Sequence, residues 1–153
     1  MADLLFRETT ESDIRHVAEN MRQADAVEVY AAAGDSPMTA LVKSVEMSDE
    51  PVTVLSSEGI PLVIFGTVQR SLLTGVGIPW LLGCDEALKH KRGFAKYAPK
   101  IVELMLEDYE YLENYVHMKN RVSVRWLKRL GFKMGDPIRF PSGELFIHFS
   151  MER

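Results

Sequence analysis

The stretch NRVSVRWLKRLGF, residues 120–132, is the part of the sequence that best indicates the fold. Its apolar residues recur at helical spacing, which predicts a helix from Asn120 to Leu130. Asn120 can cap the amino end of this helix, and Gly131 supplies the turn that ends it. Ser123 is small enough for a ligand or a strand to approach the helix closely.

Alternating strands and helices flank this segment. Residues 112–116 are β-rich, residues 94–107 have helical periodicity, and residues 78–83 form an apolar run typical of a buried strand. Pro79 near the start of that run predicts a sheet edge or a bulge, because proline has no N–H for a β-ladder. Residues 138–149 predict a closing hairpin.

The first half of the chain predicts a short strand, three helices and a hairpin. Thr10, with Asp13 three residues later, fits a capping box and so marks a helix start. Ser36 and Pro37 mark another, since proline is favoured at the first helical position. Residues 52–66 hold two β-rich runs around a short turn, and Gly75 and Gly77 are expected in the loop that follows.

The complete order is β-α-α-α-β-β-β-α-β-α-β-β, which predicts an α/β fold with a mixed sheet and helices on its faces. The length of 153 residues is typical of one domain, so residues 1–153 are expected to form a single domain. No apolar run approaches the roughly 20 residues that span a bilayer, and the N-terminus lacks the order of a signal peptide. With a single cysteine, Cys84, these features favour a reducing cytoplasm.

Charge is unevenly distributed along the chain, although the net charge is only -4. Residues 1–88 hold 5 Lys+Arg against 14 Asp+Glu, whereas residues 89–153 hold 13 against 8. The basic runs are either the solvated faces of two helices or a surface for a phosphate-bearing ligand. Nucleic acid is an unlikely partner, because the whole chain is acidic and the basic runs lack interleaved aromatic residues.

The segment HKRGFA, residues 90–95, precedes the predicted helix that starts near Phe94. A glycine lets backbone approach a phosphate, and N–H groups at a helix start bind anions. Asp85 and Glu86 lie in the same predicted loop and oppose such a ligand. An ordinary strand-to-helix turn explains the segment as well.

The element order and both segments resemble the GCN5-related N-acetyltransferase (GNAT) superfamily. Residues 120–132 are similar to its fourth-helix signature, and the matching residues are Asn120, Ser123, Leu130, Gly131 and Phe132. Residues 90–95 resemble its Arg/Gln-x-x-Gly-x-Gly/Ala loop, with His90 in place of Arg or Gln. The resemblance implies a GNAT-like acyl-CoA N-acyltransferase fold.

The GNAT resemblance also implies acetyl-CoA as a cofactor, an acceptor amine of unknown identity, and no metal. The cofactor-binding residues that it implies are Leu82, Gly83, Arg92, Gly93, Phe94, Ala95, Asn120 and Ser123. Many members carry a catalytic tyrosine on the fourth helix, where this chain has Leu127. Leucine has no proton to donate to a leaving thiolate.

Three other residues are candidates for the missing chemistry. His117, just after a predicted strand, has a side chain suited to proton transfer near neutral pH, although a surface histidine explains it as well. Tyr115 on the same strand is either catalytic or a core tyrosine. Cys84 ends a strand near the expected thioester, but a free, partly buried cysteine is the favoured interpretation. The four histidines, at positions 16, 90, 117 and 148, lack metal-ligand spacing.

A closer resemblance covers most of the chain. Trp80-Leu81-Leu82, Asn114-Tyr115-Val116 and residues 120–128 resemble a small protein family of short-tailed bacteriophages, described as an internal virion or assembly protein with a GNAT-related fold. This resemblance implies a phage or prophage origin, phage structural or assembly proteins as partners, and a location in the bacterial host cytoplasm or the virion. Two functions therefore stay open, an acetyl-CoA-dependent N-acetyltransferase and a catalytically inactive relative that acts in virion assembly.

Overall fold

The computed structural model describes residues 3–71 and 73–153. Seven strands form one mixed sheet in the order β1-β2-β3-β4-β5-β7-β6. The strands are β1 (Leu5–Glu8), β2 (Ser48–Leu55), β3 (Pro61–Ser71), β4 (Val76–Gly83), β5 (Tyr111–His117), β6 (Lys133–Arg139) and β7 (Leu145–Glu152). The helices are α1 (Glu11–Glu19), α2 (Gln23–Ala33), α3 (Pro37–Met47), the 3₁₀-helix η1 (Asp85–His90), α4 (Lys91–Asp108) and α5 (Arg121–Leu130). The predicted fold class and element order are confirmed.

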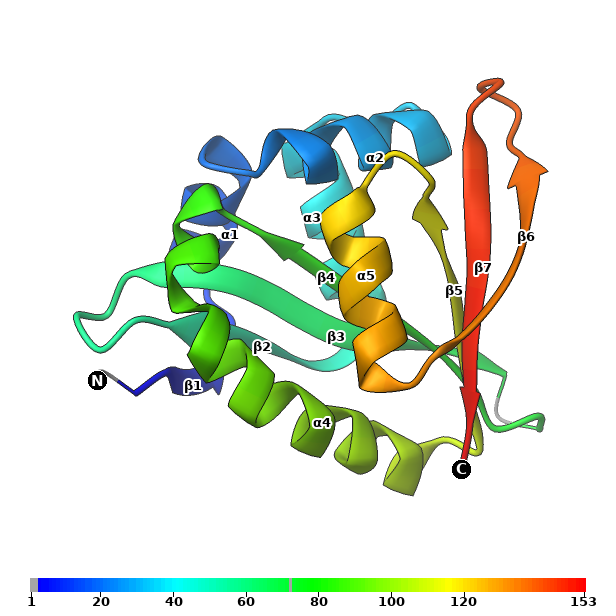
Figure 1. Cartoon of the computed structure of the whole chain (residues 1–153). Helices are drawn as coiled ribbons and strands as arrows, with labels where there is room; N and C mark the ends of the chain where they lie inside the picture. The colour runs from blue at the N-terminus through cyan, green and yellow to red at the C-terminus, as the bar shows by residue number, and fades with distance from the viewer. Residues whose placement is uncertain (1–2, 72) are drawn as a thin grey trace.

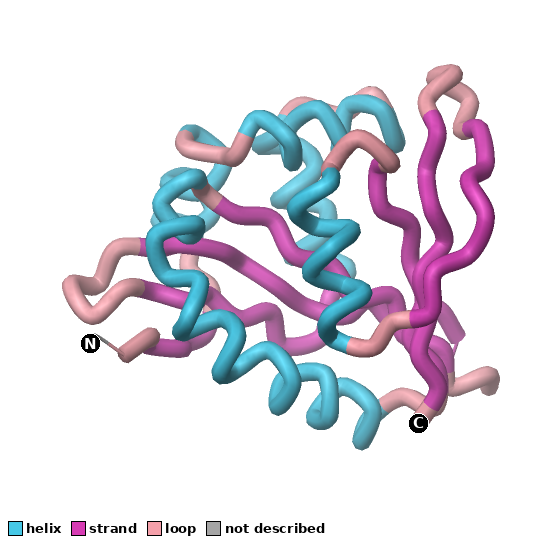
Figure 2. Tube along the Cα trace, in the orientation of Figure 1, coloured by secondary structure: helices cyan, strands magenta, loops and turns pink. Residues whose placement is uncertain are grey.

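The helices form two layers, one on each face of the sheet (Figures 1 and 2). Alternation along β3 and β4 assigns the layers, because successive side chains of a strand point to opposite faces. Ile64 and Leu82 pack with Val17 of α1 and Leu41 of α3. The neighbouring residues of these strands pack against α4, for example Leu81 against Phe94. Helices α1–α3 thus cover one face, and α4 and α5 cover the other.

The helix starts that the sequence predicts are confirmed. The Asp13 N–H donates to Thr10 Oγ1 (3.2 Å), and the Thr10 N–H donates to Asp13 Oδ2 (3.0 Å), which completes the capping box. Ser36 caps α3 with Pro37 at its first position. Gly34 ends α2 at a φ of 74°, a left-handed conformation that favours glycine.

Strands β4 and β5 are adjacent but separate early. Their parallel pairing consists of Val76 with Tyr111 and Gly77 with Leu112, whereas β4 stays paired with β3 up to Gly83. Pro79 lies beyond the last β4–β5 pair, so the edge that this proline predicts is confirmed as a local one. Beyond Gly77, one side of β4 is therefore free of a partner strand.

Two local predictions were wrong. Gly77 lies inside β4 and not in a loop, because an added Cβ would come within 2.7 Å of both Thr67 and Tyr109, and only glycine fits that packing. Residues before Phe94 were expected to be a loop, but η1 runs directly into α4, which begins at Lys91. Gly93 and Ala95 are consequently helical residues. No helix in the described part of the chain is long and apolar enough to cross a membrane.

Candidate functional site

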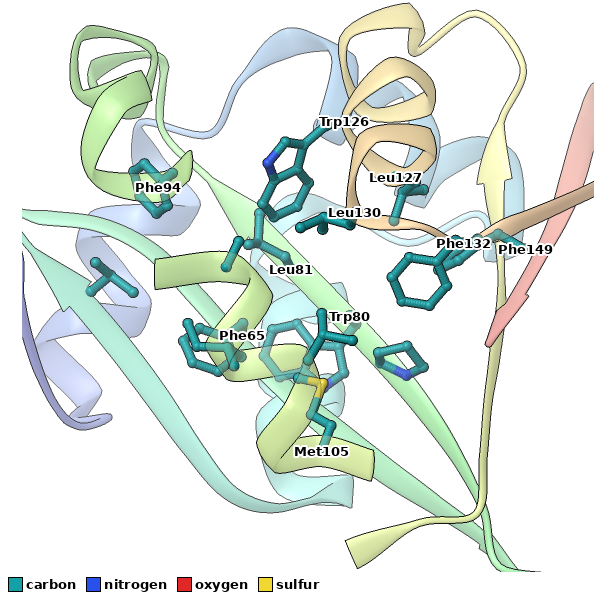
Figure 3. A pocket seen from close by; sticks show the side chains of 15 residues that line it. Phe65, Trp80, Leu81, Phe94, Met105, Trp126, Leu127, Leu130, Phe132 and Phe149 are labelled. Atoms are coloured by element: carbon teal, nitrogen blue, oxygen red, sulfur yellow. The ribbon is translucent and has the colours of Figure 1, made fainter. Parts of the chain in front are cut away.

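A cavity of about 100 Å³ lies where β4 leaves β5, between the sheet and helices α4 and α5. Its lining is apolar and includes Leu81 of β4, Phe94 of α4, and Trp126 and Leu127 of α5 (Figure 3). The cavity belongs to the cleft in which the GNAT resemblance implies acetyl-CoA. Its volume is that of a few water molecules, so side chains fill most of the space between the two helices.

The free side of β4 presents backbone groups to the cleft. The Cys84 N–H donates to Leu62 O of β3 (2.9 Å), which fixes which N–H groups face β3. By alternation, the N–H of Leu82 also faces β3, while those of Leu81 and Gly83 face the cleft. Of the two residues predicted to hold the cofactor on β4, only Gly83 directs its N–H toward it.

Both cleft-facing backbone groups of Gly83 already have partners from the start of α2. The Gly83 N–H donates to Asp25 Oδ2 (3.0 Å), and the Gly83 carbonyl accepts the N–H of Arg22 (2.8 Å). Met21 and Cys84 form an isolated antiparallel β-bridge beside these bonds. The segment between α1 and α2 therefore pairs with the end of β4 as a short additional strand would.

Asp25 is the centre of a buried polar cluster, with 2% of its surface exposed. Its other oxygen, Oδ1, accepts hydrogen bonds from Arg22 Nη1 (3.0 Å) and from Asn120 Nδ2 (3.4 Å). Burial raises the pKa of the Asp25 carboxyl, and the Arg22 guanidinium opposes that rise. Asn120 stands at the N-cap position of α5, but its side chain binds this cluster and does not cap the helix. The predicted capping role of the Asn120 side chain was wrong.

Glu28, one turn after Asp25 on α2, extends the cluster to β5. Its Oε2 accepts the backbone N–H of His117 (2.9 Å) and the Asn120 amide (3.3 Å). Burial raises the pKa of Glu28 to about 7, and the nearby Asp25 adds to the rise. Through Asp25 and Glu28, α2 is bonded to the separated ends of both β4 and β5.

His117 and Tyr115 point away from the cavity between α4 and α5. Alternation along β5 puts both side chains on one face, while Val116 packs in the core beneath those helices. The His117 ring is 2% exposed, and its Nε2 lies 3.2 Å from Glu144 Oε1. Tyr115 is exposed and packs edge-on against Phe140. Both side chains therefore lie on the α2 side of the sheet. Their catalytic roles stay predictions.

The remaining candidates also have structural partners. Leu127, at the position of the usual tyrosine, is buried in the core with Val116 and Phe149. Cys84 is buried, and burial raises the pKa of its thiol to about 11, with nearby Asp85 adding to the rise. At neutral pH Cys84 is therefore a protonated thiol and a poor nucleophile.

The amino end of α4 differs from the predicted pyrophosphate loop. The side of Gly93 that lacks a Cβ faces Leu4, whose Cδ1 and Cγ would lie 2.9 Å from an added Cβ. Gly93 thus allows close packing of α4 on the N-terminal segment. Arg92 and Ala95 are exposed, Phe94 lines the cavity, and Ser123 is half-buried on α5. The described residues contain no group of three or more side chains that could hold a metal ion.

Three residues that organise the cleft were not predicted from the sequence: Arg22, Asp25 and Glu28. One signal was available. Asp25 and Glu28 are spaced i, i+3 in the otherwise mostly apolar helix QADAVEVYAAA, residues 23–33, so they share one face. The more apolar side of this helix, with Val27 and Tyr30, is the exposed one.

Solved structures of similar architecture identify the fold. A GCN5-related N-acetyltransferase from Kribbella flavida superposes with a TM-score of 0.73 at 15% identity over 98% of both chains. The spermidine N-acetyltransferase of Vibrio cholerae, in complex with CoA and spermine, gives 0.73 at 10% identity over 98% of this chain and 95% of that one. AAC(6′)-Ib in complex with ribostamycin and coenzyme A gives 0.69 at 16% identity, over 99% and 94%. The chain therefore has the GNAT acyl-CoA N-acyltransferase fold.

Sequence comparison then identifies the family. Residues 52–137, more than half of the chain, match the family model described as "Bacteriophage T7, probable scaffold protein Gp13". The chain belongs to this family. No curated protein matches the chain.

Two of the residues that the GNAT resemblance implies for acetyl-CoA binding have other neighbours within the chain. The N–H of Gly83 is bonded to Asp25, and the missing Cβ of Gly93 makes room for Leu4. The catalytic tyrosine is replaced by the buried Leu127. At the end of β4 an expected cofactor group is therefore bonded within the chain, whereas Arg92 and Ala95 at the start of α4 are exposed.

Proposed function

We propose that the chain acts in the assembly of phage particles through protein contacts, as a GNAT-fold protein whose cofactor position on β4 is taken by its own helix α2. The description of its family as a probable scaffold protein supports the assembly role. The pair of bonds from Asp25 and Arg22 to Gly83 supports the part of the proposal that concerns the cofactor position. The proposed site of action is the cytoplasm of the bacterial host or the virion.

The energetics of the cluster support a loss of cofactor binding. A ligand that pairs with the end of β4 must first displace Asp25 and Arg22 from Gly83. Separating a buried carboxylate from its partners costs about 3–5 kcal/mol, because the charge is left without compensation. A ligand must recover this free energy before any affinity remains.

The test uses the phage or prophage that encodes the chain. Deleting the gene should lower the yield of infectious particles, and the wild-type gene should restore it. A variant with Arg92→Glu and Ala95→Glu adds two exposed carboxylates at the amino end of α4, which would repel a pyrophosphate. This variant should restore the yield fully. An unchanged yield after deletion, or failure of a folded double variant to restore it, contradicts the proposal.

A second function, acyl transfer from acetyl-CoA to an amine, is favoured by two observations. The N–H of Leu81 faces the cleft beside the apolar cavity, and Glu28 has a pKa of about 7, suited to proton transfer. The test is thermal melting with acetyl-CoA, since a ligand that binds only the folded state raises the midpoint. A rise, with thiol release in the presence of amines, favours this function. An unchanged midpoint at millimolar ligand rejects it.

A further inference from the structure

Helix α5 carries four cations on its outer side. All four are exposed: Arg121, Arg125, Lys128 and Arg129. Their spacing puts them along one side of the helix, over a length of about 12 Å. Among the described residues, no carboxylate forms an ion pair with any of them. We call these four residues the α5 stripe.

The segment that contains the stripe differs in charge from the rest of the chain. Residues 119–133 hold six Lys+Arg and no Asp+Glu, whereas the remaining residues hold 12 Lys+Arg against 22 Asp+Glu. The net negative charge of the chain therefore comes from other segments. A charge distribution of this kind attracts a polyanion to the basic side of the molecule and repels it from the acidic remainder.

Helix stability does not explain the whole stripe. Arg121 is the first residue of α5, where the helix dipole disfavours positive charge, and the first turn has no acidic residue. The same end has no side-chain cap, because Asn120 binds the buried polar cluster. Arg125 lies four residues from Arg121 and from Arg129, and like charges at this spacing destabilise a helix. The arrangement costs helix stability, so it indicates a ligand for the stripe.

The residues between the cations indicate which polyanion fits. Trp126 is the one aromatic residue of α5, and it lines the cavity with Phe94 of α4, so it is not free to stack on a base (Figure 3). Proteins that bind single strands use such stacking. Ser123 is the one neutral polar residue of α5 and is half-buried, so the outer side lacks a neutral group for the 2′-hydroxyls by which duplex RNA is recognised.

We propose that the α5 stripe binds the phosphate backbone of double-stranded DNA without sequence preference. Duplex DNA carries one negative charge per about 1.7 Å of its axis, so a stripe about 12 Å long faces several phosphates. Phosphate contacts carry no sequence information. The missing aromatic residues, which weigh against nucleic acid in the sequence, weigh against single strands but not against a duplex backbone. This binding goes beyond the proposed assembly role and does not depend on the state of the β4 cleft.

The experiment is a fluorescence anisotropy titration of the full chain into labelled DNA duplexes of about 20 base pairs and of two unrelated sequences. Both duplexes should bind with similar affinity. The logarithm of the association constant should fall with the logarithm of salt concentration with a slope of about -3 to -4, as four phosphate contacts predict. The affinity should thus fall about a hundredfold between about 50 mM and about 200 mM salt.

Two matched variants assign the binding to α5. Arg121→Gln with Arg125→Gln should weaken binding at least about tenfold at low salt and reduce the slope by about 2. The control, Arg15→Gln with Lys43→Gln, removes the same charge from exposed positions on α1 and α3, on the opposite face of the sheet, and should bind like wild type. Glutamine is a good helix former, so both variants should fold, which circular dichroism checks.

Three results would overturn the inference. The first is no DNA binding by wild type at about 50 mM salt and protein up to about 100 μM, within the usual range of non-specific affinity. The second is an equal loss of binding in the control variant. The third concerns an anionic membrane, since Val122 beside the stripe is 44% exposed. Binding to phosphatidylserine vesicles without binding to DNA would replace the duplex by a lipid surface. The phage-yield test can fail or succeed independently of these results.

Discussion

The two ends of the predicted cofactor site differ in how far their polar groups are already bonded. At the end of β4, the N–H and carbonyl of Gly83 are both taken by α2, in a cluster that excludes solvent. At the amino end of α4, Arg92 is exposed, and no described carboxylate pairs with it. The GNAT resemblance implies cofactor contacts at both ends, yet the backbone groups of Gly83 are bonded within the chain whereas Arg92 is exposed.

The largest effect is expected from Asp25→Ala. This change removes the partner of the Gly83 N–H and leaves the guanidinium of Arg22, which is only 11% exposed, without its carboxylate. The free energy of unfolding should fall by about 3–5 kcal/mol in a urea titration. Asp35→Ala, which breaks the exposed pair with Lys43, is the control and should cost less than about 1 kcal/mol. Equal effects would show that the cluster is not structural.

The next effect is a pH dependence caused by Glu28. Its pKa is raised from 4.5 to about 7, so the folded state holds a proton that the unfolded state releases. The contribution of Glu28 to the free energy of unfolding should therefore be fully present below about pH 4.5 and be lost as pH rises through about 7, by on the order of 1–3 kcal/mol because Glu28 is partly exposed. Glu28→Gln keeps the acceptor for the His117 N–H and should remove this decrease. Because Asp25 adds to the rise of the Glu28 pKa, the difference between the two curves reports Glu28 together with its effect on Asp25. Parallel curves would contradict the assignment of the pH dependence to Glu28.

A smaller effect distinguishes packing from phosphate binding at Gly93. Gly93→Ala puts a Cβ against Leu4, and we expect a net cost of about 1 kcal/mol after the gain in helix propensity. In a Leu4→Ala background the same change should become neutral or stabilising, because the clash is gone. The measurement is a double-mutant cycle by chemical denaturation. Additive effects would mean that Leu4 is not the reason for the glycine.

The smallest effect is expected at the open end of the site. Arg92→Ser removes an exposed cation and should change the free energy of unfolding by less than about 0.5 kcal/mol. Comparing this change in the free energy of unfolding with the loss in Asp25→Ala measures how differently the two ends of the predicted cofactor site contribute to stability. A loss at Arg92 as large as that at Asp25 would show that the two ends are equally integrated into the fold.

Local rules in the sequence predicted most of the fold. The Thr10 capping box and the Ser36-Pro37 start depend on neighbours within four residues, and the structure has both. Pro79 predicted that one side of β4 lacks a partner strand at that position, because proline has no N–H to donate to a neighbouring strand. The errors at Gly77 and Gly93 share one cause. In both cases the glycine makes room for a residue distant in the sequence, and spacing does not reveal such a contact.

The site was harder to predict because its bonds connect distant segments. Asn120 was identified as a helix cap, but its amide binds Asp25 and Glu28, more than 90 positions earlier. Nothing near Gly83 in the sequence indicates that a carboxylate from α2 takes its N–H. Leucine at position 127, in place of the usual tyrosine, could be recognised from the sequence. That comparison needs only the residues of one helix.

The most direct test of the central claim is an NMR titration of ¹⁵N-labelled protein with acetyl-CoA, followed at the amides of Gly83 and Leu81. The account predicts that the Gly83 amide signal stays unchanged at millimolar acetyl-CoA, because its N–H remains bonded to Asp25. It also predicts that the signal shifts in Asp25→Asn without ligand. A saturable shift of Gly83 in the wild-type protein would contradict the claim, because it would show that the cofactor takes the place of α2 on β4.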